Sequence, residues 1–220
     1  MVSKFIISIF VVLSLLVSSC SNATVKPRII NLTGKNTIIF NQEIDPVSVD
    51  NAIKGLIGAR TMLPENETLI VILVSGGGEY SRGKVILSLI SKLPNIQIYC
   101  KYCASMAGAI FVGSGVKRLV TAKSVLLMHE MFYPHFTAQM AMNAAYAKSL
   151  IEDSDEFNKE FYKRVPMTKE AYEKKILNTE WTLYGEEIIK NNLADEMVEF
   201  NCDIYVKTLA PDTCSKEVKK

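Results

Sequence analysis

Short apolar runs alternate along most of the chain with longer stretches in which apolar residues recur at helical spacing. The run Leu69–Val74 contains no polar side chain, which is typical of a strand covered by helices on both faces. Strands are predicted over 37–40, 68–74, 96–100, 118–121 and 125–128, and helices over 46–62, 81–92 and 105–114. This order predicts an α/β domain with a largely parallel sheet.

In the last third of the chain, apolar residues recur mostly at the spacing of a helix. Residues Thr137–Lys163 are rich in Ala, Met and charged residues and predict one long helix, serving either as an arm for oligomer contacts or as a cover for the sheet. The pattern does not decide between these two roles. Near Trp181 the spacing breaks, and a helix over Tyr184–Asn192 leading into a short strand at Leu193–Asp195 is predicted.

The N-terminus differs from the rest of the chain. A single Lys4 precedes the apolar run Phe5–Val17, which suits a cleaved signal peptide and is too short to span a bilayer comfortably. The next residues, Val17–Cys20, resemble the bacterial lipobox, and this resemblance implies that Cys20 carries the lipid of an exported, periplasm-facing lipoprotein of the cell envelope. An ordinary signal peptide and an uncleaved anchor are the alternatives.

Length and charge narrow the class of protein further. A chain of 220 residues that is 49% hydrophobic is expected to form one domain with a sizeable core. Its formal charge is +2, with Lys and Arg interleaved among Asp and Glu, which argues against a nucleic-acid partner. The predicted divisions are a signal peptide (1–19), a lipid-anchored linker (20–35), the folded domain (36–201) and a C-terminal tail (202–220).

Four cysteines follow the predicted lipid site, in a chain expected to reside in an oxidising compartment. Cys202 and Cys214 flank a short loop, and a disulfide between them would hold down a tail that has little apolar content. The spacing of Cys100 and Cys103 matches a redox dithiol, but no thioredoxin-like pattern surrounds the pair. A structural role is therefore favoured for these two.

A glycine-rich turn, Gly76–Gly78, follows the predicted strand over 68–74 directly. A phosphate-binding loop is the rival interpretation, but the Lys-Ser or Lys-Thr pair is absent and Glu79 places a negative charge beside the turn. The turn suits an oxyanion hole better: Gly77 or Gly78 would offer one backbone N–H, and Met106, at the start of a predicted helix, would offer another.

Ser105 lies among small residues where a predicted strand gives way to a helix, a placement that suits a nucleophile. His129 ends another predicted strand downstream and is the candidate general base; His135, in a predicted loop, competes for this role. Taken singly, each signal is weak, because serine is a common helix N-cap and histidine is often structural. Their order and spacing, with the glycine-rich turn upstream, favour acyl transfer at Ser105.

These segments resemble the proteolytic subunit of the Clp protease, within the Clp/crotonase superfamily, over residues 36–199. The matches are Ser75–Gly78 for the family's Ser-Pro-Gly-Gly, Ala104–Met106 for its Ala-Ser-Met, Leu127–Glu130 for its Met-Ile-His-Gln, and Thr37–Phe40 for its opening strand. The resemblance implies a spiral of β-β-α units with a largely parallel sheet and a protruding long helix. It also implies a serine endopeptidase with Ser105 as nucleophile and His129 as base.

The chain departs from the family at the third triad residue, because no aspartate stands at the expected place. Counting back from the following helix reaches Glu180, whereas counting forward from the preceding helix reaches Thr179, with Asn178 adjacent. Glu180 is the preferred candidate, since a carboxylate both orients an imidazole and stabilises its charged form. The alternatives are Asn178, Thr179, or a site with a Ser-His dyad alone.

The resemblance further implies a homo-oligomeric ring that acts on peptides or unfolded proteins without cofactor or metal. A cytosolic Clp ATPase is not an expected partner of an exported protein, so an ATP-independent peptidase is predicted. The main alternative is a catalytically impaired scaffold or peptide-binding lipoprotein. Two lesser alternatives are a signal-peptide-peptidase-like enzyme using a Ser-Lys pair and a crotonase-like enzyme acting on acyl thioesters. For the first, the chain offers Lys84, Lys117 and Lys123, none of them in a context that matches that family.

Overall fold

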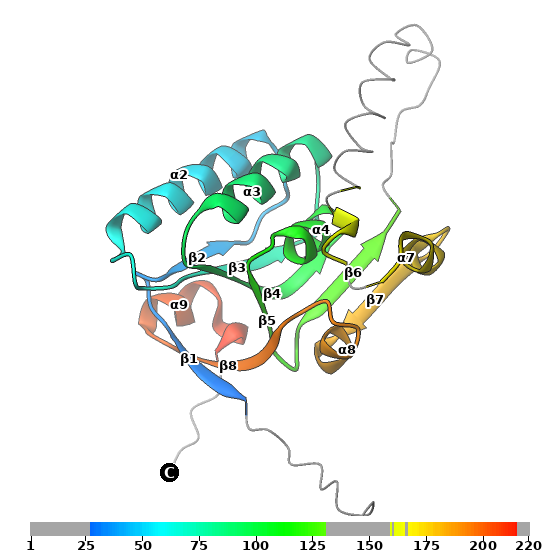
Figure 1. The fold of residues 1–220 in the computed structure, drawn as a ribbon. Coiled ribbons are helices and arrows are strands. Elements are labelled where there is room, and N and C mark those ends of the chain that lie inside the picture. The colour runs from blue at the N-terminus through cyan, green and yellow to red at the C-terminus, as the bar shows by residue number, and fades with distance from the viewer. Residues whose placement is uncertain (1–26, 131–158, 160, 166, 215–220) are drawn as a thin grey trace, which may run out of the picture.

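The computed structural model describes residues 27–130, 159, 161–165 and 167–214. The fold is α/β, with a mixed, mostly parallel sheet whose principal strand order is β1-β8-β5-β4-β3-β2 (Figure 1). Two further strands lie off this path: β6 pairs with β4 in parallel, and β7 pairs with β6 in antiparallel orientation. The strands are β1 (Arg28–Leu32), β2 (Thr37–Phe40), β3 (Leu69–Ser75), β4 (Ile96–Ala104), β5 (Lys117–Val120), β6 (Val125–His129), β7 (Glu180–Tyr184) and β8 (Glu196–Cys202).

Helices lie on both faces of the sheet, as the continuous apolar strands predicted. They are α2 (Pro46–Met62), α3 (Tyr80–Lys92), α4 (Met106–Gly113), α7 (Lys169–Ile176), α8 (Gly185–Lys190), α9 (Ile204–Leu209) and the 3₁₀ turn η1 (Pro211–Thr213). Leu69, Val71 and Leu73 of β3 belong to the core cluster that α2, α3 and α4 cover. Ile70 and Ile72 belong to the cluster under α9, on the opposite face (Figure 1).

The strand β4 changes neighbours part-way along its length. Its first half pairs with β5, from Gln97 to Tyr99, and its last residues, Tyr102 to Ala104, pair with β6. On the other edge, the register with β3 shifts so that Leu73 faces Cys100 while Val74 faces Tyr102. Lys101 is therefore an extra residue in β4, and such a bulge bends a strand.

Residues 28–32, which the sequence placed in a linker, form β1 and pair in parallel with β8. Leu32 is the only fully buried side chain of this edge strand, so its sequence lacks the apolar run of a central strand. The folded domain thus begins before residue 36.

The predicted C-terminal tail is also part of the domain. Val206 of α9 is fully buried, Ala210 nearly so, and a disulfide joins Cys202 to Cys214 as predicted. Because α9 packs on the sheet, the boundary expected at residue 201 lies too early.

The last strand begins later than predicted. Residues Leu193–Asp195 form the connection to β8 rather than a strand. Asn192 has a φ of 55°, and the N–H of Leu193 bonds the carbonyl of Ile188, so a left-handed residue ends α8 and redirects the chain. The long helix expected over 137–163 falls almost wholly outside the described residues, as do Cys20, His135 and the predicted signal peptide.

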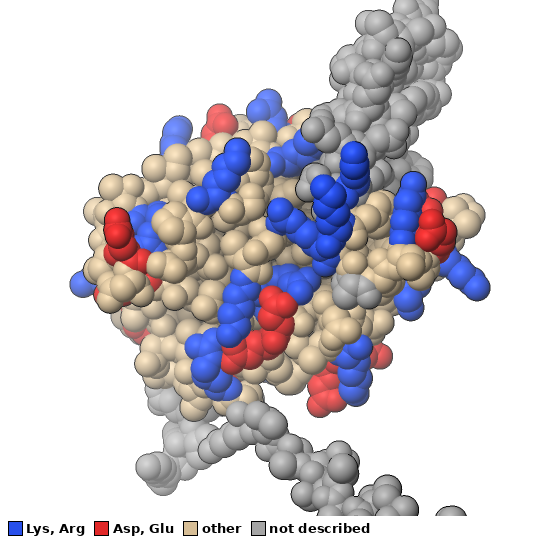
Figure 2. Space-filling view, viewed as in Figure 1, with Lys and Arg blue, Asp and Glu red and all other residues tan. Residues whose placement is uncertain are grey.

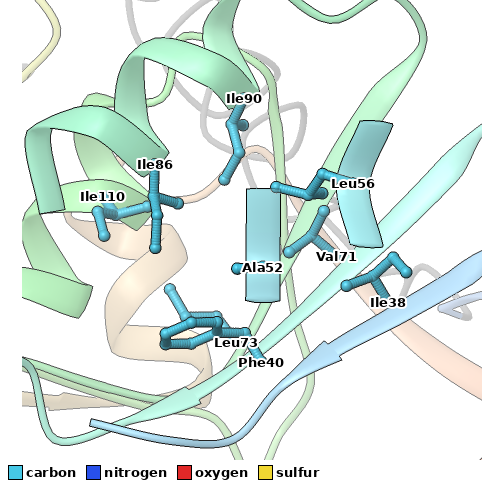
Figure 3. A pocket seen from close by; sticks show the side chains of 9 residues that line it. All are labelled: Ile38, Phe40, Ala52, Leu56, Val71, Leu73, Ile86, Ile90 and Ile110. Carbon is cyan, nitrogen blue, oxygen red and sulfur yellow. The ribbon is translucent and has the colours of Figure 1, made fainter. Parts of the chain in front are cut away.

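A cavity of about 10 Å³ lies between α2, α3 and the strands β2 and β3, and only apolar side chains line it (Figure 3). A space of this size holds at most one water molecule, and an apolar lining keeps it dry. The cavity is a packing defect of the core. In the described part of the chain, no helix is both long and apolar enough to cross a membrane.

Candidate functional site

Ser105 lies at the junction of β4 and α4 in a backbone conformation that few side-chain-bearing residues adopt. Its φ is 55° and its ψ is −125°, whereas the helix begins at Met106. The N–H of Ser105 donates to the carbonyl of Leu127 on β6, at 2.9 Å. A non-glycine residue held in such a conformation marks a place where the surrounding structure fixes one side chain in one direction.

The first turn of α4 presents backbone donors beside Ser105. Ala109 is the first residue of this helix whose N–H reaches back four positions, to the carbonyl of Ser105, at 3.1 Å. Met106 lies in the first turn of the helix, before these bonds begin, and its N–H has no hydrogen-bond acceptor among the described residues. The positive end of the helix dipole adds to the attraction of this donor for an anion.

The glycine-rich turn packs directly against the serine. A Cβ atom on Gly77 would lie 2.6 Å from the Cβ of Ser105 and 3.0 Å from the nitrogen of Met106. The φ angles of Gly77 and Gly78 are 101° and 140°, which favour glycine at both positions. The glycine-rich turn and Ser105 therefore lie side by side.

Hydrogen bonds distinguish the two glycines as oxyanion donors. The N–H of Gly77 donates to the buried Oγ of Ser75, at 3.2 Å, and its carbonyl accepts from Ile44, at 2.7 Å. Gly78 lies opposite Ile44 in a parallel β-bridge, whose two hydrogen bonds join Ile44 to the carbonyl of Gly77 and to the N–H of Glu79. The N–H of Gly78 is not used in this bridge and points away from Ile44. Gly78 and Met106 are therefore better candidates than Gly77, whose N–H is already used.

His129 ends β6, two residues beyond the Leu127 carbonyl that holds Ser105. Leu126 and Met128 point into the core, and His129, one residue further along, is half-buried on the opposite face of the strand. No hydrogen bond joins Ser105 to His129 in the described part of the chain. Catalytic hydrogen bonds are often long or poorly aligned until a substrate binds.

The ring of His129 has a partner that the sequence did not predict. Its Nδ1 forms a hydrogen bond with the backbone carbonyl of Glu130. The Glu130 carboxylate in turn accepts from the backbone N–H of Asn178, at 3.0 Å. Nothing in the sequence pointed to this pair, because residues 130 and 178 are far apart in the chain.

The three candidates for the third triad residue occupy different positions. Glu180 stands directly opposite His129 in the antiparallel pair of β6 and β7, so the two side chains lie on the same face. Glu180 is exposed, and no hydrogen bond to His129 is present among the described residues. Thr179 donates its N–H to the carbonyl of Ile176, and Asn178, with a φ of 54°, donates to Glu130.

The lysines considered for a Ser-Lys pair have other surroundings. Lys117 pairs with Gln97 in the β4–β5 register and is thus eight residues, roughly 26 Å, from Ser105 along β4. Lys123 is exposed in the turn before β6. Lys84 lies on α3 with its Nζ 5.6 Å from the ring centre of Tyr80.

Cys100 and Cys103 form a disulfide within β4, ending two residues before Ser105. Both side chains are fully buried, and the bond spans the bulge at Lys101. This placement agrees with a structural role. Within the described ranges, no group of three or more His, Cys, Asp and Glu side chains is arranged to hold a metal ion.

No protein-family model matches the chain, and no curated protein is significantly similar to it. The interpretation of the site therefore depends on its geometry.

Proposed function

We propose that the protein is a serine endopeptidase with Ser105 as nucleophile and His129 as general base. The observation that carries this proposal is the conformation of Ser105: a φ of 55° at a strand-to-helix junction, in contact with Gly77 and beside the N–H groups at the start of α4. A serine with a purely structural N-cap role would instead have an extended backbone and bond the helix through its side chain. Ser105 makes no such cap bond.

In the proposed reaction, the Oγ of Ser105 attacks the carbonyl carbon of a peptide bond while His129 takes the hydroxyl proton. The N–H groups of Met106 and Gly78 stabilise the tetrahedral oxyanion. His129 then protonates the leaving amine, and a water molecule, activated by the same imidazole, hydrolyses the acyl-enzyme. The substrate lies extended along the turn at Gly78, whose backbone groups are directed away from Ile44.

The finer parts of the proposal rest on the sequence resemblance. They are a Clp/crotonase spiral, a homo-oligomeric ring, and a cell-envelope lipoprotein anchored through Cys20 that cleaves peptides or unfolded proteins without ATP. The disulfides Cys100–Cys103 and Cys202–Cys214 support export, because such bonds persist in oxidising compartments.

A fluorophosphonate probe tests the proposal, since it reacts with activated serines. We expect stoichiometric labelling of Ser105 in the full chain, located by mass spectrometry, and none in Ser105→Ala. His129→Ala should lower the labelling rate by about 10²-fold or more, because it removes the base.

Absence of labelling in a correctly folded wild-type protein would contradict the peptidase and favour the scaffold alternative. Unchanged labelling in His129→Ala would instead remove His129 from the site and direct attention to Lys84 or His135.

A further inference from the structure

The missing aspartate leaves the question of what orients the imidazole of His129. A triad aspartate accepts the Nδ1–H of the histidine, which fixes the ring and leaves Nε2 free to accept the serine proton. In this structure the partner of Nδ1 is the carbonyl of Glu130. A carbonyl accepts but does not donate, so this bond selects the same Nδ1–H tautomer.

That carbonyl belongs to a residue whose side chain is itself tied down. Glu130 directly follows β6, and its carboxylate binds the N–H of Asn178, two residues before β7 begins. Asn178 has a φ of 54°, and the N–H of Thr179 bonds the carbonyl of Ile176, so the chain makes a tight turn there. The Glu130 side chain therefore links the end of β6 to the turn that starts β7.

We propose that Glu130 is a positioning residue that replaces the absent aspartate. Its carbonyl holds Nδ1 of His129, and its carboxylate keeps that carbonyl in place through Asn178. Glu180, although opposite His129 in the strand register, is not needed for this role. The predicted effects of this inference on kcat rest on the proposed peptidase function. The contact between Glu130 and His129 can be tested by NMR in a protein without activity.

The kinetic test compares Glu130→Ala and Glu130→Gln with Glu180→Gln, which removes the carboxylate of the rival candidate opposite His129. The glutamine keeps an oxygen that accepts from Asn178, whereas alanine loses it. We expect Glu130→Ala to lower kcat, and the labelling rate of Ser105, by roughly 10- to 100-fold with KM unchanged, because a misplaced base costs about this much. Glu130→Gln should stay within about threefold of wild type, and Glu180→Gln should lower kcat less than Glu130→Ala does.

The second test uses nitrogen NMR of protein labelled with [¹⁵N]histidine, with His135→Gln to assign the two rings. We expect the neutral His129 ring to be the Nδ1–H tautomer in wild type and in Glu130→Gln, and a tautomer mixture in Glu130→Ala. Circular dichroism and the melting temperature show whether each variant folds.

The outcomes separate the two proposals. An Nε2–H tautomer in wild type overturns the role of Glu130 whatever the activity, and so does loss of kcat in Glu180→Gln with none in Glu130→Ala. An Nδ1–H tautomer that depends on residue 130, in a protein whose serine never labels, supports the contact and overturns the peptidase.

Discussion

At Gly77 the backbone has a φ of 101°, and a Cβ atom would meet the Cβ of Ser105, the carbonyl of Ala104 and the nitrogen of Met106, all within 3.0 Å. Two of these contacts are with backbone, which cannot move aside without shifting the start of α4. The neighbouring Gly76 has neither restriction: its φ is not positive, and a Cβ atom there would find nothing within 4 Å.

These facts give a matched pair of substitutions. Gly77→Ala should lower the labelling rate of Ser105 by roughly 10- to 100-fold, because it displaces the proposed nucleophile, and should destabilise the fold by about 1–3 kcal/mol. Gly76→Ala should leave both within error. Probe kinetics and urea unfolding measure the two effects. Equal labelling rates in the two variants would mean that the conformation of Gly77 does not control the reactivity of Ser105.

The sequence predicted the residues of the site unevenly, for a physical reason. Ser105 and Gly77 were recognisable because a serine where a strand gives way to a helix and a glycine at a tight turn are local features of the sequence. The role suggested for Glu130 was not, since it arises from a hydrogen bond to Asn178 across 48 positions of sequence. Contacts of this kind depend on the register in which β6 and β7 pair, and no local sequence pattern predicts that register.

Among the elements, strands with a continuous apolar run were predicted well, and strands with several exposed side chains were predicted poorly. The strand at 37–40 and the helix at 46–62 have the predicted bounds, and the helix start is fixed by Asp45, whose carboxylate accepts from the N–H of Ser48. The strands β1 and β7 were missed because most of their side chains are exposed or half-buried. Only burial on both faces produces an uninterrupted apolar run.

The two disulfides belong to different elements and should have separable effects. Cys100–Cys103 holds the bulged end of β4 beside Ser105, whereas Cys202–Cys214 holds α9 and η1 against the sheet. Chain-entropy arguments give about 2 kcal/mol for the shorter loop and about 3 kcal/mol for the longer one.

We therefore expect the Cys202→Ala/Cys214→Ala double variant to lose more stability yet keep the wild-type labelling rate of Ser105. The Cys100→Ala/Cys103→Ala double variant should lose less stability but label at least tenfold more slowly, because the end of β4 is released. Urea unfolding and probe kinetics on the same preparations give both numbers. Slow labelling in the C-terminal variant alone would show that β4 keeps its shape without its disulfide.

At the scale of the whole molecule, charged groups join strands that are distant in sequence. Arg28 of β1 donates two hydrogen bonds to Glu196 of β8, at 2.7 and 2.9 Å, and the Nζ of Lys117 on β5 lies 2.5 Å from the same carboxylate. Basic and acidic side chains gather over these three strands on the face shown in Figure 2. The hydrogen bond from Arg28 is the main cause that lowers the pKa of Glu196 to about 2.

This shift makes the stability of the sheet edge depend on pH. Because the folded-state pKa lies below the ordinary value of 4.5, the carboxylate stabilises the fold above pH 4.5, and this contribution is lost as the pH falls towards 2. Glu196→Gln should therefore unfold more easily at pH 7, and its stability should fall less steeply between pH 4.5 and 2. The Glu196 side chain is partly exposed to solvent, so 1 M salt should reduce the difference by screening.

Urea unfolding at several pH values, with and without salt, measures this dependence. Some acid sensitivity should remain in Glu196→Gln, because the N–H groups of Val206 and Gly34 also lower the pKa of Asp203, at the start of α9. The Asp203→Asn variant serves as the control, because it shows how much of the remaining acid sensitivity comes from Asp203. A Glu196→Gln protein with the full wild-type slope would show that the ion pairs of Glu196 add nothing to folding. Backbone pairing with β8 and the burial of Leu32 would then hold β1 to the domain.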